Sequence, residues 1–110
     1  MTESVDTETL IALKEIMEDD FQDLVRTYLE DSQMRIPQLR VQLAAADSEA
    51  LRLTAHSLKG SSGNLGANIM TKLCWHIELQ AAEQKLDGLE ATLDQIDAEF
   101  EQVTKILLNS

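Results

Sequence analysis

Proline, glycine, cysteine and aromatic residues are all scarce in this 110-residue sequence, which has 1 Pro, 4 Gly, 1 Cys and 4% aromatic residues. A single cysteine excludes an internal disulfide. Basic side chains are few, 9 against 20 acidic ones, and the net charge of -11 argues against proteins that bind nucleic acid or anionic lipid by charge. No apolar run approaches the roughly 18 residues of a membrane span, and no signal segment opens the chain. These absences predict a small cytoplasmic protein with neither nucleic acid nor membrane as a partner.

What the sequence does contain is helical periodicity. Apolar residues make up 44% of the chain, enough for a core, and no alternating apolar and polar segment predicts a strand. Apolar side chains instead recur at steps of three and four, which is typical of amphipathic helices. Five segments show this pattern: residues 10–17, 21–46, 51–62, 69–81 and 89–107. In the last two the predicted buried lines are Ile69, Leu73, Ile77 and Ala81, and Leu89, Leu93, Ile96, Phe100, Val103 and Leu107.

The segment boundaries carry helix start and stop signals. Candidate N-caps precede the segments: Asp6 or Thr7, Asp19 or Asp20, Asp47, and Asp87 in a capping box with Glu90. Gly63 to Gly66 reads as a helix stop. The apolar stripe of residues 21–46 keeps its phase through Pro37, which predicts a kinked helix rather than a loop at that position.

Short connections make successive helices antiparallel neighbours. The predicted fold is therefore all-α, an antiparallel up-down-up-down four-helix bundle with a short additional N-terminal helix covering one end. Residues 1–110 would form a single domain. Because the bundle buries its own apolar stripes, we expect a monomer. The initiating Met1 favours a free-standing protein.

One stretch departs from ordinary bundle sequence, since three of the four glycines fall between residues 60 and 66. A glycine inside a helix costs ~1 kcal/mol relative to alanine, and such departures are frequent at functional sites. On a helical wheel the line of Leu51, Ala55, Leu58 and Ser62 faces the core. His56 lies roughly 130° from its centre, facing solvent beside Lys59, Gly60 and Gly63.

This arrangement suits transfer of a phosphoryl group through histidine. A neutral imidazole is a nucleophile at physiological pH, and covalent capture on nitrogen divides one transfer into two. In-line transfer needs an open approach, which Gly60 and Gly63 would provide, and a positive charge near the phosphoryl oxygens, which Lys59 would provide. An exposed histidine beside a lysine is also common on ordinary surfaces, so spacing alone leaves this reading open.

The stretch resembles the signature of histidine-containing phosphotransfer (HPt) domains, roughly H-x-x-K-G-x-[SA]-x-x-x-G, and the helix pattern resembles the family over nearly the whole chain. The matching residues run in order as Ala55-His56-Ser57-Leu58-Lys59-Gly60-Ser61-Ser62-Gly63-Asn64-Leu65-Gly66-Ala67. The resemblance implies that His56 is phosphorylated on Nε2, that Lys59 stabilises the phosphoryl group and that Gly60 leaves room for a partner. It further implies that Glu78, from another helix, accepts a hydrogen bond from Nδ1–H.

The resemblance also implies the partners. Such a protein relays phosphate between the aspartates of response-regulator receiver domains, downstream of a hybrid sensor histidine kinase. It would be a phosphotransfer intermediate without kinase activity, holding no cofactor or metal, with Mg²⁺ supplied by the receiver domain. The sequence agrees, because it has no glycine-rich phosphate loop of the Walker or kinase type.

The sequence offers three alternatives to phosphotransfer. A non-catalytic helical adaptor or regulatory binding module would use the face around His56, including Leu53, without any phosphate. A metal site from Cys74, His76 and Glu78 is geometrically poor, since His76 lies roughly 200° from Cys74 on one helix. Hydrolase chemistry fails because serines adjacent to His56 on a helix point elsewhere. The role of Trp75, either core edge or partner contact, stays open.

Overall fold

The computed structural model describes residues 3–110, so Met1 and the inference drawn from it lie outside the described residues. Within this range the chain is helical and contains no strand. A 3-10 turn, η1 (Glu18–Asp20), follows the first helix. The α-helices are α1 (Thr7–Met17), α2 (Phe21–Ala44), α3 (Ser48–Asn64), α4 (Asn68–Ala82) and α5 (Leu89–Leu108).

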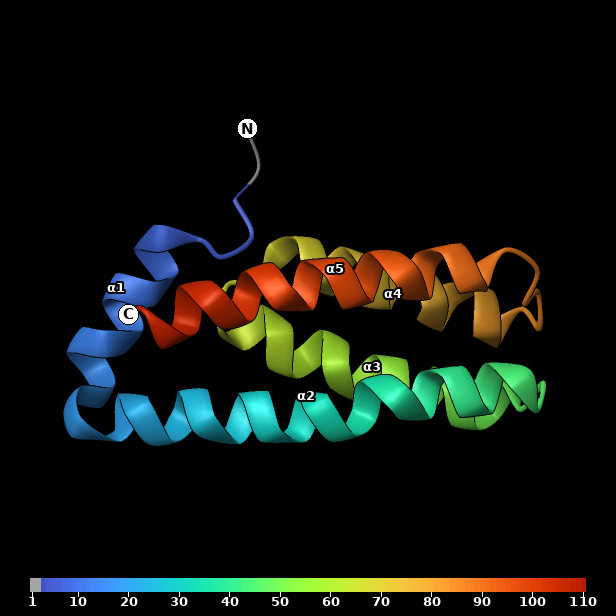
Figure 1. The fold of residues 1–110 in the computed structure, drawn as a ribbon, viewed down its shortest axis with the longest axis horizontal. Helices are drawn as coiled ribbons and strands as arrows, with labels where there is room; N and C mark the ends of the chain where they lie inside the picture. The colour runs from blue at the N-terminus through green and yellow to red at the C-terminus, as the bar shows by residue number, and fades with distance from the viewer. Residues whose placement is uncertain (1–2) are drawn as a thin grey trace.

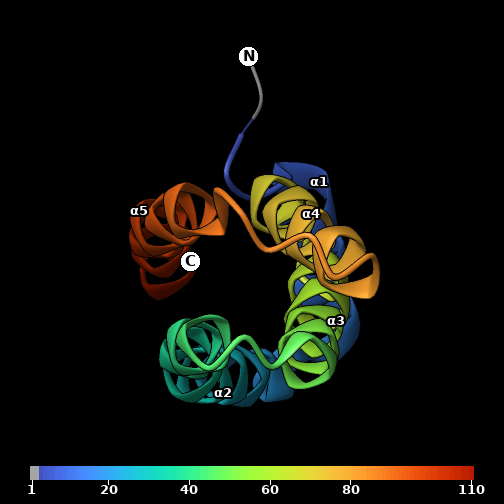
Figure 2. The same ribbon diagram turned by 90° about the vertical axis from the view of Figure 1, so that its right-hand side faces the viewer.

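The four long helices run up, down, up and down along the 42 Å axis of the molecule (Figure 1). Seen end-on, α2, α3, α4 and α5 surround a common interior (Figure 2), and α1 lies at one end of the bundle (Figure 1). Helix α2 is continuous through Pro37, as its unbroken stripe predicts. The predicted four-helix bundle with a short N-terminal helix is confirmed. None of the helices among residues 3–110 is both long and apolar enough to span a bilayer.

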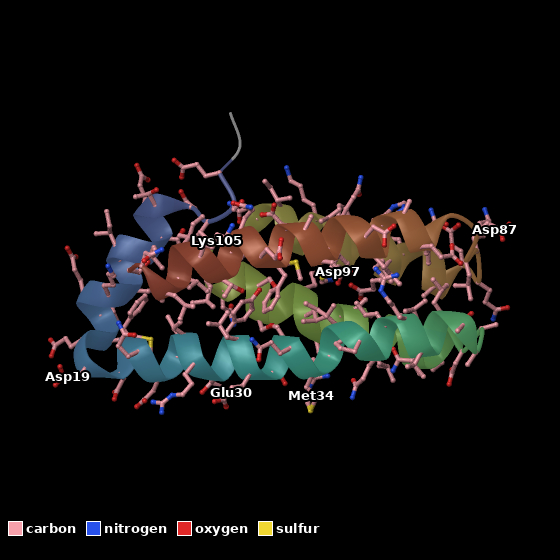
Figure 3. All side chains as sticks on the ribbon, in the orientation of Figure 1. Asp19, Glu30, Met34, Asp87, Asp97 and Lys105 are labelled. Carbon is pink, nitrogen blue, oxygen red and sulfur yellow. The ribbon has the colours of Figure 1, made fainter. Side chains whose placement is uncertain are left out.

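The core consists of the predicted stripes, with one shift of phase. On α3 and α5 the expected residues are buried, although Phe100 is only partly covered. On α4 the buried line is Met70, Cys74, Ile77 and Ala81, whereas the predicted Ile69 and Leu73 are partly exposed. The buried face of the first half of α4 is therefore centred one residue later than predicted, on Met70 and Cys74. Side chains outside the stripes, such as Glu30 and Met34, point away from the bundle (Figure 3).

Only some of the predicted caps form. The carboxylate of Asp47 accepts a hydrogen bond from the Ala50 N–H at 3.1 Å, as predicted. Asp20 makes no such bond, because the chain enters α2 directly from η1 with helical backbone angles. The capping box at Asp87 is also wrong: Gly88 occupies the cap position with φ +81, and no side chain bonds the first turn of α5. Ala46, expected at the end of the α2 stripe, lies in the following turn and is exposed.

The end of α3 is held against the N-terminal segment. Gly66 adopts φ +77 and its carbonyl accepts a hydrogen bond from the Asp6 N–H at 2.8 Å. A Cβ on Gly66 would lie 2.9 Å from the Cβ of Thr9, too close for any other residue without movement. Asp6 stands at the predicted N-cap of α1, but its carboxylate accepts from the Thr9 hydroxyl rather than from the backbone. Gly66 therefore fixes where α1 meets the bundle.

Candidate functional site

The orientation of α3 is set from both its start and its inner face. Asp47 fixes the first turn, and the buried residues Leu51, Ala55 and Leu58 commit one side of the helix to the core. His56, on the outer side, is consequently exposed over 61% of its side chain. The sequence-based prediction of a solvent-facing histidine on this helix is confirmed.

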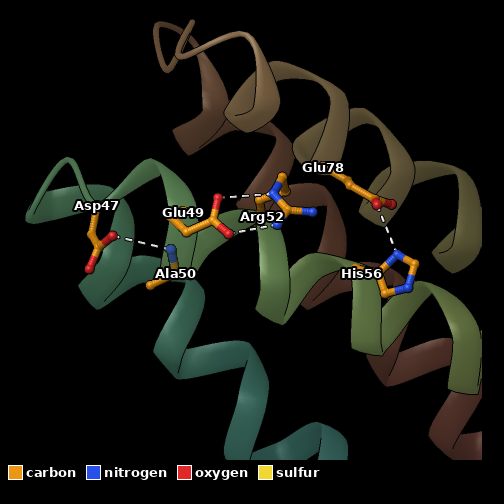
Figure 4. A network of polar contacts seen from close by, with 6 residues as sticks. All are labelled: Asp47, Glu49, Ala50, Arg52, His56 and Glu78. Atoms are coloured by element: carbon orange, nitrogen blue, oxygen red, sulfur yellow. Dashed lines mark hydrogen bonds and ion pairs between the residues drawn. The ribbon is translucent and has the colours of Figure 1, made fainter.

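A carboxylate from the neighbouring helix holds the His56 ring. The Nδ1 atom of His56 lies 2.8 Å from Oε2 of Glu78 on α4, within hydrogen-bond distance. Figure 4 shows this contact and shows the other ring nitrogen directed away from Glu78. A carboxylate acceptor at Nδ1 favours the tautomer with the proton there, which leaves the Nε2 lone pair free toward solvent. The expected contact between His56 and Glu78 is therefore present.

The same carboxylate binds Lys59. The Lys59 Nζ atom lies 2.6 Å from Oε1 of Glu78, whose side chain is only 15% exposed. Burial alone would raise the pKa of the Glu78 carboxyl, but the hydrogen bonds and charges of Lys59 and His56 outweigh it, so this pKa lies below its ordinary value. Glu78 is thus ionised at neutral pH and joins the two α3 side chains. The sequence placed Lys59 beside His56 but did not predict this ion pair.

The two glycines on the outer face differ in their surroundings. A Cβ built on Gly60 would have no atom within 4 Å, so the surface beside His56 is open at this position. A Cβ on Gly63 would lie 3.7 Å from Thr71 Oγ1 of α4, in ordinary contact. Gly60 fits the expected role of leaving space for another molecule. Gly63 borders the contact between α3 and α4 and adds less to that opening.

The three residues of the alternative metal site, Cys74, His76 and Glu78, do not form a site in the structure. Cys74 is fully buried, and burial, followed by the charge of Glu78, raises the pKa of its thiol to about 12. His76 is exposed, and Glu78 is already bound by His56 and Lys59. In the part of the chain that the structure describes, no three His, Cys, Asp or Glu side chains are grouped to hold a metal ion.

Exposed apolar side chains lie close in sequence to His56 on α3 and to Glu78 on α4. Leu53 precedes His56 by three residues on α3, while Trp75 and Leu79 flank Glu78 on α4, and all three are about half exposed. Trp75, left undecided from the sequence, is therefore a surface residue. Leu79 was missed by the sequence analysis, although it lies out of phase with the buried Ile77 and Ala81. Such residues are suited to contact a partner.

Comparison with known proteins supports the resemblance. A sequence model of the Hpt domain matches residues 23–105. The crystal structure of histidine-containing phosphotransfer protein B from Pseudomonas aeruginosa PAO1 matches with a TM-score of 0.94 and 35% identity, covering 99% of this chain and 95% of that one. The phosphorelay intermediate protein rdeA of Dictyostelium discoideum is 27% identical over 85 residues, or 77% of this chain. The chain spans about a third of the length of rdeA, since the match covers 34% of that protein. By its sequence match and its fold, the chain belongs to the Hpt domain family.

Proposed function

We propose that this chain is a histidine phosphotransfer protein that relays a phosphoryl group between aspartates of response-regulator receiver domains through His56. The observation that carries the proposal is the hydrogen bond between Nδ1 and Glu78, which leaves Nε2 exposed as the nucleophile. The open surface at Gly60 supports the approach of a receiver domain. The neighbouring Lys59 supports charge stabilisation of the phosphoryl oxygens.

The proposed chemistry is an in-line transfer. The Nε2 lone pair attacks the phosphorus of an aspartyl phosphate, a P–N bond forms, and the P–O bond to the aspartate breaks with its electron pair. Transfer to the next receiver reverses these steps. The receiver domain supplies the Mg²⁺, and a hybrid sensor histidine kinase supplies the phosphate upstream. This chain itself would have no kinase activity and no cofactor.

The proposal extends to the state of the protein. Residues 1–110 would act as a single domain and as a monomer, because the apolar stripes of the long helices are used within one bundle. The protein would act in the cytoplasm. The exposed residues Leu53, Trp75 and Leu79 would contact the receiver domain around the histidine.

The test is a phosphotransfer profile against purified receiver domains that have been charged with acetyl phosphate. We expect acid-labile phosphate on the wild-type protein with a subset of receivers, and none on the His56→Gln variant. Persistence of label in His56→Gln would remove His56 from the site.

A second function, a non-catalytic adaptor, is favoured by the same exposed apolar residues. It predicts that a receiver or another partner binds wild-type and His56→Gln protein equally and that no label appears with any receiver. That result would contradict phosphotransfer through His56 and support the function of a non-catalytic adaptor.

A further inference from the structure

Both polar side-chain contacts that cross between α3 and α4 among residues 3–110 end on one carboxylate. His56 Nδ1 lies 2.8 Å from Oε2 of Glu78, and Lys59 Nζ lies 2.6 Å from Oε1. In the resting protein the Lys59 ammonium is therefore bound to Glu78 rather than directed at the free Nε2 atom. To bind a phosphoryl group on His56, a lysine engaged in this way has to give up its ion pair with Glu78 or share the ammonium between the two groups.

Phosphorylation alters the charges around this carboxylate. When Nε2 bonds to phosphorus and Nδ1 keeps its proton, no proton leaves, so the imidazole ring becomes cationic while the phosphoryl group brings negative oxygens. The ring then provides Glu78 with a full positive partner at Nδ1. The phosphoryl oxygens, in contrast, need a cation and repel the Glu78 carboxylate. Lys59, one turn from His56 on the same face of α3, carries a flexible stem and three donors that can make this move.

We propose that Lys59 exchanges partners during transfer, leaving the carboxylate of Glu78 for the phosphoryl group on His56. This inference rests on the proposed function and assigns different duties to the three residues. Lys59 is a catalytic residue that is held in reserve by an ion pair. Glu78 is a positioning residue, which stores the ammonium in the resting state and balances the cationic ring in the phosphorylated state.

A double-substitution cycle tests the exchange. Under single-turnover conditions with a saturating charged receiver domain, we expect Lys59→Gln to slow transfer about tenfold, the size of one charge-assisted hydrogen bond. In the Glu78→Gln background the loss caused by Lys59→Gln should be at least as large, because no carboxylate competes for the ammonium there. If Lys59 acts only by holding Glu78, its substitution has no effect in that background, which overturns the exchange.

A spectroscopic measurement on the wild-type protein gives an independent readout that does not depend on variants folding. The ¹⁵N signal of the Lys59 ammonium and the ¹³C signal of the Glu78 carboxyl should both move on phosphorylation, while the ammonium of Lys72, an exposed lysine on α4, stays unmoved. Lys72→Gln is the matched variant in the kinetic assay and should transfer at the wild-type rate.

The outcomes separate the two proposals. Phosphate on His56 with an unmoved Lys59 signal contradicts the exchange, whatever the Glu78 signal does, and leaves the proposed relay intact. Absence of phosphate on His56 with every receiver domain overturns the relay, and the exchange with it.

Discussion

Gly60 occupies a helical position and has open space beside it. It lies inside α3, where glycine weakens a helix, and a Cβ atom built there would have no neighbouring atom within 4 Å. The fold therefore gains nothing from the glycine, which points to a requirement for space outside the molecule. We predict that Gly60→Ala raises the free energy of unfolding by about 0.5–1 kcal/mol.

Gly60→Gln should also fold well, since glutamine is a good helix former. Its long side chain would however occupy the approach to His56, and we expect transfer from a charged receiver domain to slow by about tenfold or more. Urea unfolding and single-turnover transfer measure the two effects separately, with Gly60→Ala as the small-side-chain control. A wild-type transfer rate in Gly60→Gln would show that the receiver does not approach over Gly60.

At the site, the sequence could predict which side chains share one face of α3, but not which of them contact side chains of α4. Spacing along α3 placed His56, Lys59 and Gly60 on one surface, because that geometry follows from the helical repeat. The resemblance added Glu78 as the acceptor for Nδ1–H. The ion pair between Lys59 and Glu78 was missed, since it depends on how far α3 and α4 are shifted along each other. Lys59 and Glu78 were both expected beside His56, however, and this was a signal that their side chains would also contact each other.

At the scale of the helices, two glycines stand at junctions. Gly66 lies where α1 meets the bundle and Gly88 where α5 begins, and the structure tolerates replacement of Gly66 less well. Both glycines have left-handed backbone angles, φ +77 and φ +81, so alanine would be strained at either position. Only at Gly66 would the new Cβ also collide, 2.9 Å from Thr9 Cβ, whereas the space around Gly88 is open. The pair therefore separates backbone strain from packing.

We predict that Gly88→Ala lowers the free energy of unfolding by about 1–2 kcal/mol through strain alone. Gly66→Ala should cost about 1–3 kcal/mol more, because α1 or the turn must shift to admit the methyl group. Urea unfolding of both variants gives the comparison, and hydrogen exchange of α1 amides should accelerate only in Gly66→Ala. Equal losses of unfolding free energy in the two variants would mean that Thr9 moves away from the new methyl group without destabilising the fold.

The helices themselves followed from the sequence far better than their ends. Burial of an apolar stripe is repeated over several turns, so an error at one residue, as with Ile69 on α4, leaves the helix intact. A cap depends on the conformation of a single residue. Gly88 holds a left-handed conformation instead of the extended one that an N-cap uses, and η1 occupies the place where Asp20 would have capped α2. Neither arrangement leaves a trace in residue spacing.

For the molecule as a whole, the net charge of -11 gives acid two opposite effects on the free energy of unfolding. Exposed carboxylates repel one another at neutral pH, so their protonation in acid relieves repulsion and favours the folded state. Carboxylates bound to cations act in the opposite direction, because acid removes a charge that the fold uses. A pH curve of the wild-type protein alone mixes the two effects, whereas the difference from a single variant isolates one group.

Glu78 is the group whose contribution should emerge from such a difference. Despite its burial, its hydrogen bonds to Lys59 and His56 hold the pKa of the folded carboxyl below the ordinary value of 4.5. Its stabilisation is therefore complete above that value and is lost as the pH falls through the pKa of the folded state. We predict that wild-type protein is more stable than Glu78→Gln at pH about 6 and that this difference in the free energy of unfolding narrows only below the ordinary value of 4.5, toward pH about 3. Urea unfolding at each pH provides the measurement, and Glu101→Gln, which removes an exposed carboxylate from α5, controls for the change in net charge. A gap that stays constant over this range would mean that the charge of Glu78 does not support the contact between α3 and α4.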